Sequence, residues 1–109
     1  MGNYQYSIFS DAMEYILAHL EEPLQVPNIA KAIHVSQSCL QRSFRACAGE
    51  SVYAHLLRTK LRLAAELLAQ GKTVSDAARA VGFGNSNHFC RCFKKEFGIN
   101  PSQAKKQGI

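Results

Sequence analysis

The chain has 109 residues, the length of one ordinary domain or of two very small ones that share a core. Hydrophobic residues make up 47% and charged residues 19% of it, with only 3 prolines and 7 glycines, which excludes disordered, low-complexity and collagen-like chains. The net charge of +5 is uneven, because residues 1–39 hold one basic and four acidic residues whereas residues 40–109 hold twelve basic and four acidic ones. A basic domain favours a polyanionic partner, most often a nucleic acid.

Apolar periodicity predicts three helices in the first half of the chain. The first is expected over residues 9–20 and ends before Pro23. The second is expected over residues 27–33, followed by a tight turn at His34-Val35 and by a helix that Ser36 caps and Gly49 ends. The apolar stripe of the first helix is predicted to consist of Phe9, Met13, Ile16, Leu17 and Leu20.

The second half predicts a long helix over residues 51–70, which Gly71 ends. Two more helices are expected over residues 73–81 and 85–97, separated by a turn at Gly82-Phe83-Gly84, and a last short helix begins at Asn100-Pro101. No stretch alternates with the period of two that marks a strand, so the fold class is all-α. The apolar face of the long helix is predicted to consist of Tyr53, Leu56, Leu57, Leu61, Ala64, Leu67 and Leu68.

An internal repeat relates the two halves. At an offset of 48, the first copy matches the second at Val26, Ala30, Ala32 and Ile33, which correspond to Val74, Ala78, Ala80 and Val81. At an offset of 49, Leu40, Arg42, Phe44 and Gly49 correspond to Phe89, Arg91, Phe93 and Gly98. Each copy is a short helix, a turn and a longer helix, the layout of a helix-turn-helix whose second helix enters a DNA major groove. A generic helical hairpin is the alternative for one copy, but two copies with an arginine at the same place favour DNA binding.

The helix over residues 51–70 would be about 30 Å long. Successive major-groove segments on one face of a duplex lie roughly 34 Å apart. A linker of this length predicts that one monomer places both recognition helices in neighbouring segments of one duplex.

The chain resembles the AraC/XylS-type DNA-binding domain from about Phe9 to Lys105. The resemblance is carried in the first half by Ile29-Ala30, Leu40-Gln41-Arg42-Ser43-Phe44, Gly49, Leu57-Arg58, Leu61 and Ala64. In the second half it is carried by Ala77-Ala78, Val81-Gly82-Phe83, Phe89, Arg91, Phe93-Lys94-Lys95, Phe97-Gly98 and Asn100-Pro101. The chain departs from the family at Ala104-Lys105, where Tyr-Arg is usual, which leaves the packing of the last helix open.

The resemblance implies a fold of about seven helices, with two helix-turn-helix subdomains over residues 7–50 and 71–107 joined by a linker helix over residues 51–70. It also implies bacterial transcription regulation, most often activation, through DNA near a promoter and contact with RNA polymerase. Double-stranded DNA is thus the expected partner, with this domain monomeric on DNA, and we expect a cytoplasmic, nucleoid-associated protein.

Helical phase predicts which side chains read DNA. In the first recognition helix, Leu40 and Phe44 point inward, Arg42 suits guanine and Gln41 suits adenine. In the second, Phe89 and Phe93 point inward. The expected base contacts are Ser38, Gln41, Arg42, Ser86, Asn87, His88, Cys90 and Arg91. The family's base-contacting positions also fall on the first three of these. The expected phosphate contacts are Arg45, Lys72, Lys94 and Lys95. A solvated side chain is the alternative for His88 and for the lysines, and a redox-sensitive contact is an alternative for Cys90.

Cysteine chemistry offers little else. The four cysteines form no C-x-x-C pair, and Cys90 and Cys92 lie about 200° apart on a helix, so no metal site is expected at His88, Cys90 and Cys92. Free thiols are expected, with Cys47 and Cys92 as small buried residues. The pairs of His88 with Cys90 or Cys92, and of His34 with Cys39, lack an accompanying acid and an oxyanion loop, so we expect neither an enzyme nor a cofactor.

Two alternatives stay open. The first concerns function: the domain either reads DNA as described above, or is a helix-turn-helix interaction module that binds another regulator or RNA polymerase without reading DNA. The chain is a compact regulator, or the C-terminal fragment of a longer sensor. No apolar run of about 18 residues suggests a membrane span, and the first residues lack the pattern of a secretory signal.

Overall fold

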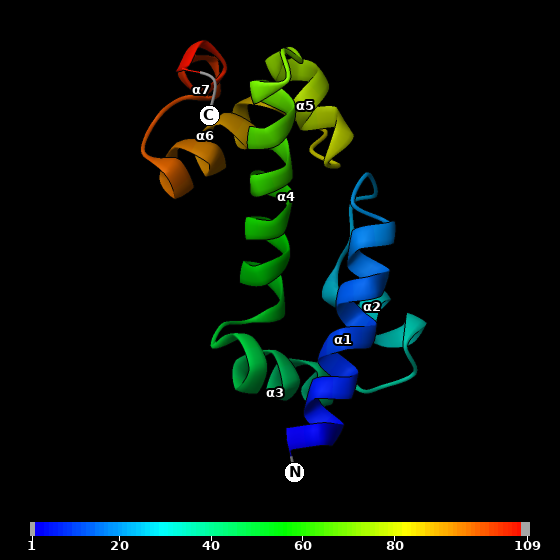
Figure 1. Cartoon of the computed structure of the whole chain (residues 1–109). Helices are drawn as coiled ribbons and strands as arrows, with labels where there is room; N and C mark the ends of the chain where they lie inside the picture. Colours follow the sequence, from blue (N-terminus) through cyan, green and yellow to red (C-terminus); the bar gives the residue numbers. More distant parts are fainter. Residues whose placement is uncertain (1, 108–109) are drawn as a thin grey trace. The chain divides into compact units, whose positions relative to one another are not determined.

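The computed structural model describes the backbone of residues 2–107 and the side chains of residues 4–104. These residues form seven helices and no strand, which confirms the all-α class (Figure 1). The helices are α1 (Gly2–Ala18), α2 (Val26–Ala32), α3 (Gln37–Ala48), α4 (Val52–Ala69), α5 (Val74–Ala80), α6 (Ser86–Phe97) and α7 (Pro101–Gln107). None of the helices in the described range is long and apolar enough to cross a membrane.

The chain divides into two compact units. The first contains the described residues up to Leu20 together with Leu24–Leu57, and the second contains Glu21–Pro23 and the described residues from Arg58 onward. The division falls inside α4 rather than at its ends, so the predicted subdomain boundaries stay a prediction. The short segment Glu21–Pro23 follows α1 in the chain but belongs to the second unit.

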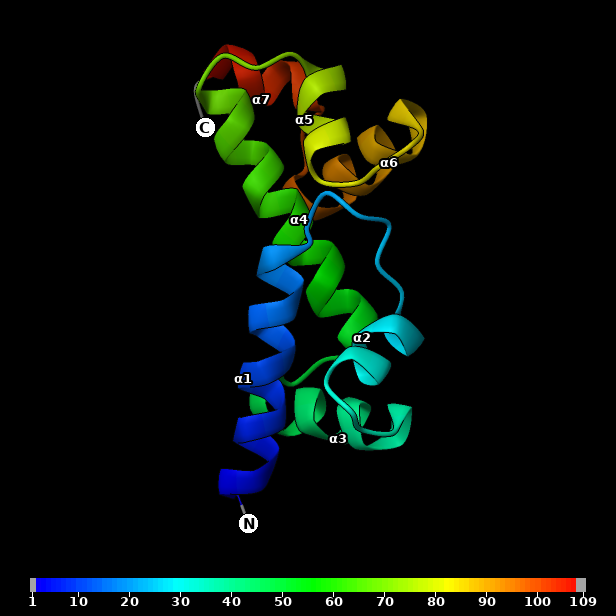
Figure 2. The ribbon, with the colours of Figure 1, turned by 90° about the vertical axis from the view of Figure 1, so that its right-hand side faces the viewer.

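In the first unit, α1 packs on α2 and α3 (Figure 2). The buried face of α1 consists of residues four apart, Ile8, Ala12 and Ile16, which continue to the buried Leu20. The ring of Phe9 meets the fully buried ring of Phe44 at 4.8 Å in an edge arrangement, and both rings contact the ring of His55. His55 is held in turn by Glu50, at 2.7 Å between Nδ1 and Oε2.

Two residues assigned to apolar faces from the sequence lie outside the core. Leu17 is 57% exposed, because burial follows the Ile8–Ala12–Ile16 row and Leu17 lies about 100° from Ile16 around the helix. Tyr53, at the start of α4, is 55% exposed. Both predictions were wrong because the apolar arc of each helix is wider than the surface that its neighbours cover.

In the second unit, α5, α6 and α7 lie around the C-terminal half of α4 (Figures 1 and 2). Its core contains the fully buried rings of Phe89 and Phe93 with Leu61, Leu68 and Val81. Aromatic contacts continue along α6, at 5.7 Å between the ring centroids of Phe89 and Phe93 and 4.6 Å between those of Phe93 and Phe97. Ala104 is fully buried in α7, so alanine packs at the position where the family usually has a larger residue.

The repeat is present in the backbone hydrogen bonds. In the first copy Val35 N donates to Ala30 O and His34 N to Lys31 O, at 3.0 and 3.2 Å. In the second, Phe83 N donates to Ala78 O and Gly82 N to Arg79 O, at 2.9 and 3.0 Å. Every pair is shifted by 48 residues. Both turns therefore place one residue in the left-handed region, His34 at φ 60° and Gly82 at φ 82°.

Capping residues begin and end the second helix of each copy. Ser36, Gly49 and Gly98 were predicted in these roles, whereas Asn85 was expected to be the first residue of its helix. Ser36 Oγ accepts a hydrogen bond from Cys39 N at 3.1 Å, and Asn85 Oδ1 accepts from Asn87 N and His88 N at 2.8 and 3.2 Å. Gly49 and Gly98 end α3 and α6 in the left-handed conformation, at φ 72° and 79°.

Candidate nucleic-acid interface

The outward face of α3 is polar and basic. Ser38, Arg42 and Arg45 are exposed, while Leu40 and Phe44 on the opposite face are fully buried. The buried residues attach α3 to the unit, so its exposed arginines are presented by a fixed helix. Among the described residues, neither arginine forms an ion pair, and both guanidinium groups keep donors for a partner.

Gln41 differs from the other predicted base contacts on α3. It is half-buried, and its Oε1 accepts a hydrogen bond from Val52 N at 3.1 Å. That N–H is the first of α4 and would otherwise lack an acceptor within the helix. Gln41 therefore joins α3 to the start of α4, a role that its helical phase alone does not indicate.

The outward face of α6 carries more polar residues. Ser86, Asn87, His88 and Arg91 are exposed, Cys90 is half-buried, and the anchors are Phe89 and Phe93. The ring of His88 lies 5.5 Å from the ring of Phe83, which follows Gly82 in the turn before α6. Lys94 and Lys95 are exposed in the last turn, where cations also stabilise the negative end of the helix dipole.

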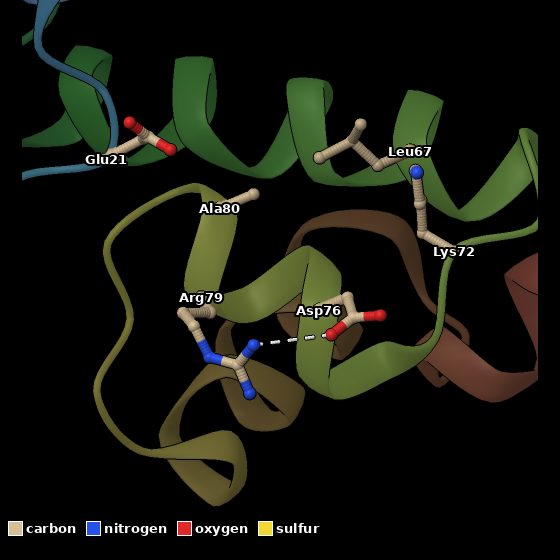
Figure 3. Close-up of a pocket in the computed structure, with 6 residues that line it drawn as sticks. All are labelled: Glu21, Leu67, Lys72, Asp76, Arg79 and Ala80. Carbon is tan, nitrogen blue, oxygen red and sulfur yellow. Dashed lines mark hydrogen bonds and ion pairs between the residues drawn. The ribbon is translucent and has the colours of Figure 1, made fainter.

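Lys72 is not on α6. It follows α4 and lines a pocket of about 310 Å³ in the second unit, beside Leu67 of α4 (Figure 3). The other lining residues are Glu21, Asp76, Arg79 and Ala80, and Arg79 Nη1 donates to Asp76 Oδ1 at 3.4 Å. Lys72 therefore stands apart from the other predicted phosphate contacts of the second unit, Lys94 and Lys95.

The four cysteines are free thiols. Cys47 is exposed, which contradicts its predicted burial. It shares the helical phase of Leu40 and Phe44, but the surface that buries those two residues does not extend to Cys47. Cys92 is only half-buried, as are Cys39 and Cys90. No group of three His, Cys, Asp or Glu side chains that could hold a metal ion occurs among the described residues.

One buried charge had no place in the sequence-based interpretation. Lys60 of α4 is only 6% exposed, and its Nζ donates to Glu22 O at 2.8 Å. Burial lowers the pKa of Lys60 below its usual value. A signal was present in the sequence, because Lys60 lies four residues from both Leu56 and Ala64 and so falls within the apolar face of the helix.

Comparison with known proteins identifies the family. A family model described as a helix-turn-helix domain matches residues 29–107. The regulatory protein SoxS of Salmonella typhimurium is 31% identical over 96 residues, which cover 87% of this chain and 90% of SoxS. An HTH-type transcriptional regulator encoded in the cgkA 5′ region of Pseudoalteromonas carrageenovora is 28% identical over 99 residues, which cover 91% of this chain. The chain spans 59% of that regulator's length and 31–32% of two other curated relatives.

Solved structures show the same fold. An AraC-type transcriptional regulator from Chromobacterium violaceum superposes with a TM-score of 0.87 at 28% identity, covering 95% of this chain and 94% of that one. The DNA-binding domain of AdpA in complex with a target DNA superposes with a TM-score of 0.84 at 22% identity, covering 90% and 89%. The second likeness concerns the fold alone. From the repeated helix-turn-helix geometry, the matched family model and these relatives, the chain belongs to the AraC-type family of helix-turn-helix transcription regulators, which bind DNA.

Proposed function

We propose that the chain binds double-stranded DNA sequence-specifically, with α3 and α6 in successive major-groove segments of one duplex. One observation carries the proposal. Two copies of one backbone pattern, with hydrogen bonds matched at an offset of 48, each bury the inner face of a second helix and expose an arginine at the equivalent position. An exposed arginine on such a helix suits the O6 and N7 acceptors of guanine in the major groove.

In α3 the proposed base contacts are Ser38, Arg42 and Gln41. The bond from Val52 N to Gln41 Oε1 leaves the Gln41 amide nitrogen as its remaining donor, so Arg42 carries most of the reading by this helix. In α6 we propose base contacts by Ser86, Asn87, His88, Cys90 and Arg91. Arg45, Lys72, Lys94 and Lys95 are proposed phosphate contacts, of which Lys72 is the least supported because it lines a pocket with two carboxylates.

The length of α4 supports recognition of one duplex by one monomer. Its 18 residues correspond to about 27 Å, comparable with the roughly 34 Å between major-groove segments on one face. We further propose that the chain acts in the cytoplasm, in association with the nucleoid, and that it activates transcription through RNA polymerase, as its family membership favours. In vitro transcription from a promoter that carries the bound sequence tests this: added protein should raise transcript yield, and a fall would assign repression instead.

In vitro selection from random duplexes, followed by fluorescence-anisotropy titration of the recovered duplex, tests DNA binding. If six to eight phosphates are neutralised, log K should fall with log salt at a slope of about −5 to −7. A two-part enriched sequence is expected, one part for each recognition helix. No enrichment, together with a salt slope near zero on the unselected random duplexes, would reject DNA reading and support the interaction module that binds another protein.

A further inference from the structure

Lys60 occupies an unusual position at the turn that precedes α6. Its Nζ donates to Glu22 O at 2.8 Å, and a Cβ built on Gly82 would lie 2.8 Å from each of these two atoms and 3.0 Å from Glu21 O. The Cα of Gly82 therefore rests directly against the lysine ammonium and against two carbonyl groups. All four residues belong to the second unit, although Glu21 and Glu22 come from the chain between α1 and α2.

The turn at Gly82 is connected to α6 by direct contacts. Phe83 N donates to Ala78 O at 2.9 Å, which closes the turn on α5. The ring of Phe83 then lies 5.3 Å from the ring of Phe89 and 5.5 Å from that of His88. Phe89 is the fully buried anchor of α6, and His88 is exposed on its outward face. A shift of the turn would thus be passed to α6 through one aromatic side chain.

We propose that Lys60 is a positioning residue for DNA recognition by α6, acting by clamping the segment Glu21–Pro23 against the turn at Gly82. The proposal rests on the proposed function of α6. The buried Lys60 ammonium packs closely against the turn, and this close packing restricts movement of the turn. Gly82 is required there because it has no Cβ and so allows this close approach. The equivalent turn of the first copy has no such requirement, since the left-handed residue there is His34, which carries an exposed side chain.

The test measures base discrimination rather than affinity alone. The duplex recovered with the wild-type chain is altered one base pair at a time, and Arg91→Ala and Arg42→Ala identify the halves that α6 and α3 read. Lys60→Met, which has a similar length but no donor, should reduce discrimination about tenfold in the α6 half and less than about twofold in the α3 half. Arg62→Met is the matched control, because Arg62 is an exposed cation on the same helix, and its discrimination should be unchanged in both halves.

A double-substitution cycle with Gly82→Ala tests whether the two residues act through one contact. The double variant should lose no more base discrimination than the single variant with the larger loss, because either change alone disrupts the same clamp. Lys60→Met with wild-type discrimination, or with equal losses in both halves, would overturn the proposal. If Lys60→Met does not fold by circular dichroism, Lys60→Arg is measured instead, and it should lose discrimination in the α6 half alone; unchanged discrimination would be the contrary result.

Amide hydrogen exchange without DNA separates failure of the clamp from failure of the proposed function. In Lys60→Met, the amides of Gly82 and Phe83 should exchange about tenfold faster than in the wild type, while those of Val35 and Leu40 in the first unit should not change. If no duplex is enriched but this difference is found, the clamp exists and the DNA-reading proposal is wrong. Equal exchange rates at Gly82 and Phe83 would reject the clamp whatever the chain binds.

Discussion

Replacing Gly82 by alanine should destabilise the second unit by about 3 kcal/mol. The left-handed conformation at φ 82° costs an alanine about 1–2 kcal/mol. The added Cβ would also lie 2.8 Å from Glu22 O and from Lys60 Nζ, so one of them must move and their charge-assisted hydrogen bond, worth about 1.5–3 kcal/mol, is weakened or lost. The smaller conformational freedom of an unfolded alanine offsets about 0.4–1 kcal/mol of this.

Two other glycines of the same unit separate these contributions. Gly98 has φ 79° with no atom within 4 Å of an added Cβ, so Gly98→Ala should cost only about 1 kcal/mol for the conformation. Gly84 has neither a left-handed φ nor a close neighbour, so Gly84→Ala should be neutral or stabilising by about 0.4–1 kcal/mol. Urea unfolding followed by circular dichroism at 222 nm would measure all three. If Gly82→Ala and Gly98→Ala differ by less than about 0.5 kcal/mol, the contact at Gly82 has no energetic effect and the reasoning fails.

Four further predictions concern the N-cap of α6, the turn at His34, the buried Lys60 and the DNA contact proposed for Arg91. Asn85→Ala removes the acceptor of two N-terminal amides of α6 and should lower the free energy of unfolding by about 1 kcal/mol, measurable by urea unfolding; no change would mean that solvent caps this helix equally well. His34→Gly removes the strain of a left-handed non-glycine residue and should raise the free energy of unfolding by at most about 1 kcal/mol, measured by urea unfolding. A fall in this free energy would show that His34 makes a stabilising contact. Because the pKa of Lys60 is lowered, the folded chain releases this proton at a lower pH than the unfolded chain. The free energy of unfolding of the wild type relative to Lys60→Met should therefore rise as the pH increases through the lowered pKa toward 10.5, and a flat or falling difference in alkaline urea titrations would contradict the cause assigned to it. Arg91→Ala should weaken binding of the selected duplex by about 1–3 kcal/mol, whereas an equal loss on every sequence would assign Arg91 to a phosphate.

Local chemistry explains why the ends of α3 and α6 could be predicted, whereas α1, which was expected over residues 9–20, is observed over Gly2–Ala18. Ser36, Asn85, Gly49 and Gly98 act within one turn of their own position, so their effect on the helix ends is readable from neighbouring residues. The matched spacing of the two copies likewise predicts both turns. The family, the all-α class and the inner anchors of α3 and α6 follow from such short-range patterns.

Longer-range contacts account for what the sequence did not predict. Exposure of Leu17 and Tyr53 depends on how much of each helix a neighbour covers, which the periodicity of that helix does not contain. Gln41 Oε1 accepts a hydrogen bond from Val52 N, eleven residues away, and Lys60 Nζ donates one to Glu22 O, thirty-eight residues away. A polar residue at an outward or apolar position reveals its partner only once the fold brings the two segments together.

The two turns of the repeat differ in what they could exchange. The turn at His34 accepts a side chain in the left-handed conformation, whereas at Gly82 two carbonyl groups and an ammonium occupy the space that a side chain would need. Transplanting Gly82-Phe83 into the first copy would thus meet no steric barrier at the left-handed position, but transplanting His34-Val35 into the second would. At the left-handed position, the two turns are therefore interchangeable in one direction only. Glycine can replace His34 in the first copy, but histidine cannot replace Gly82 in the second.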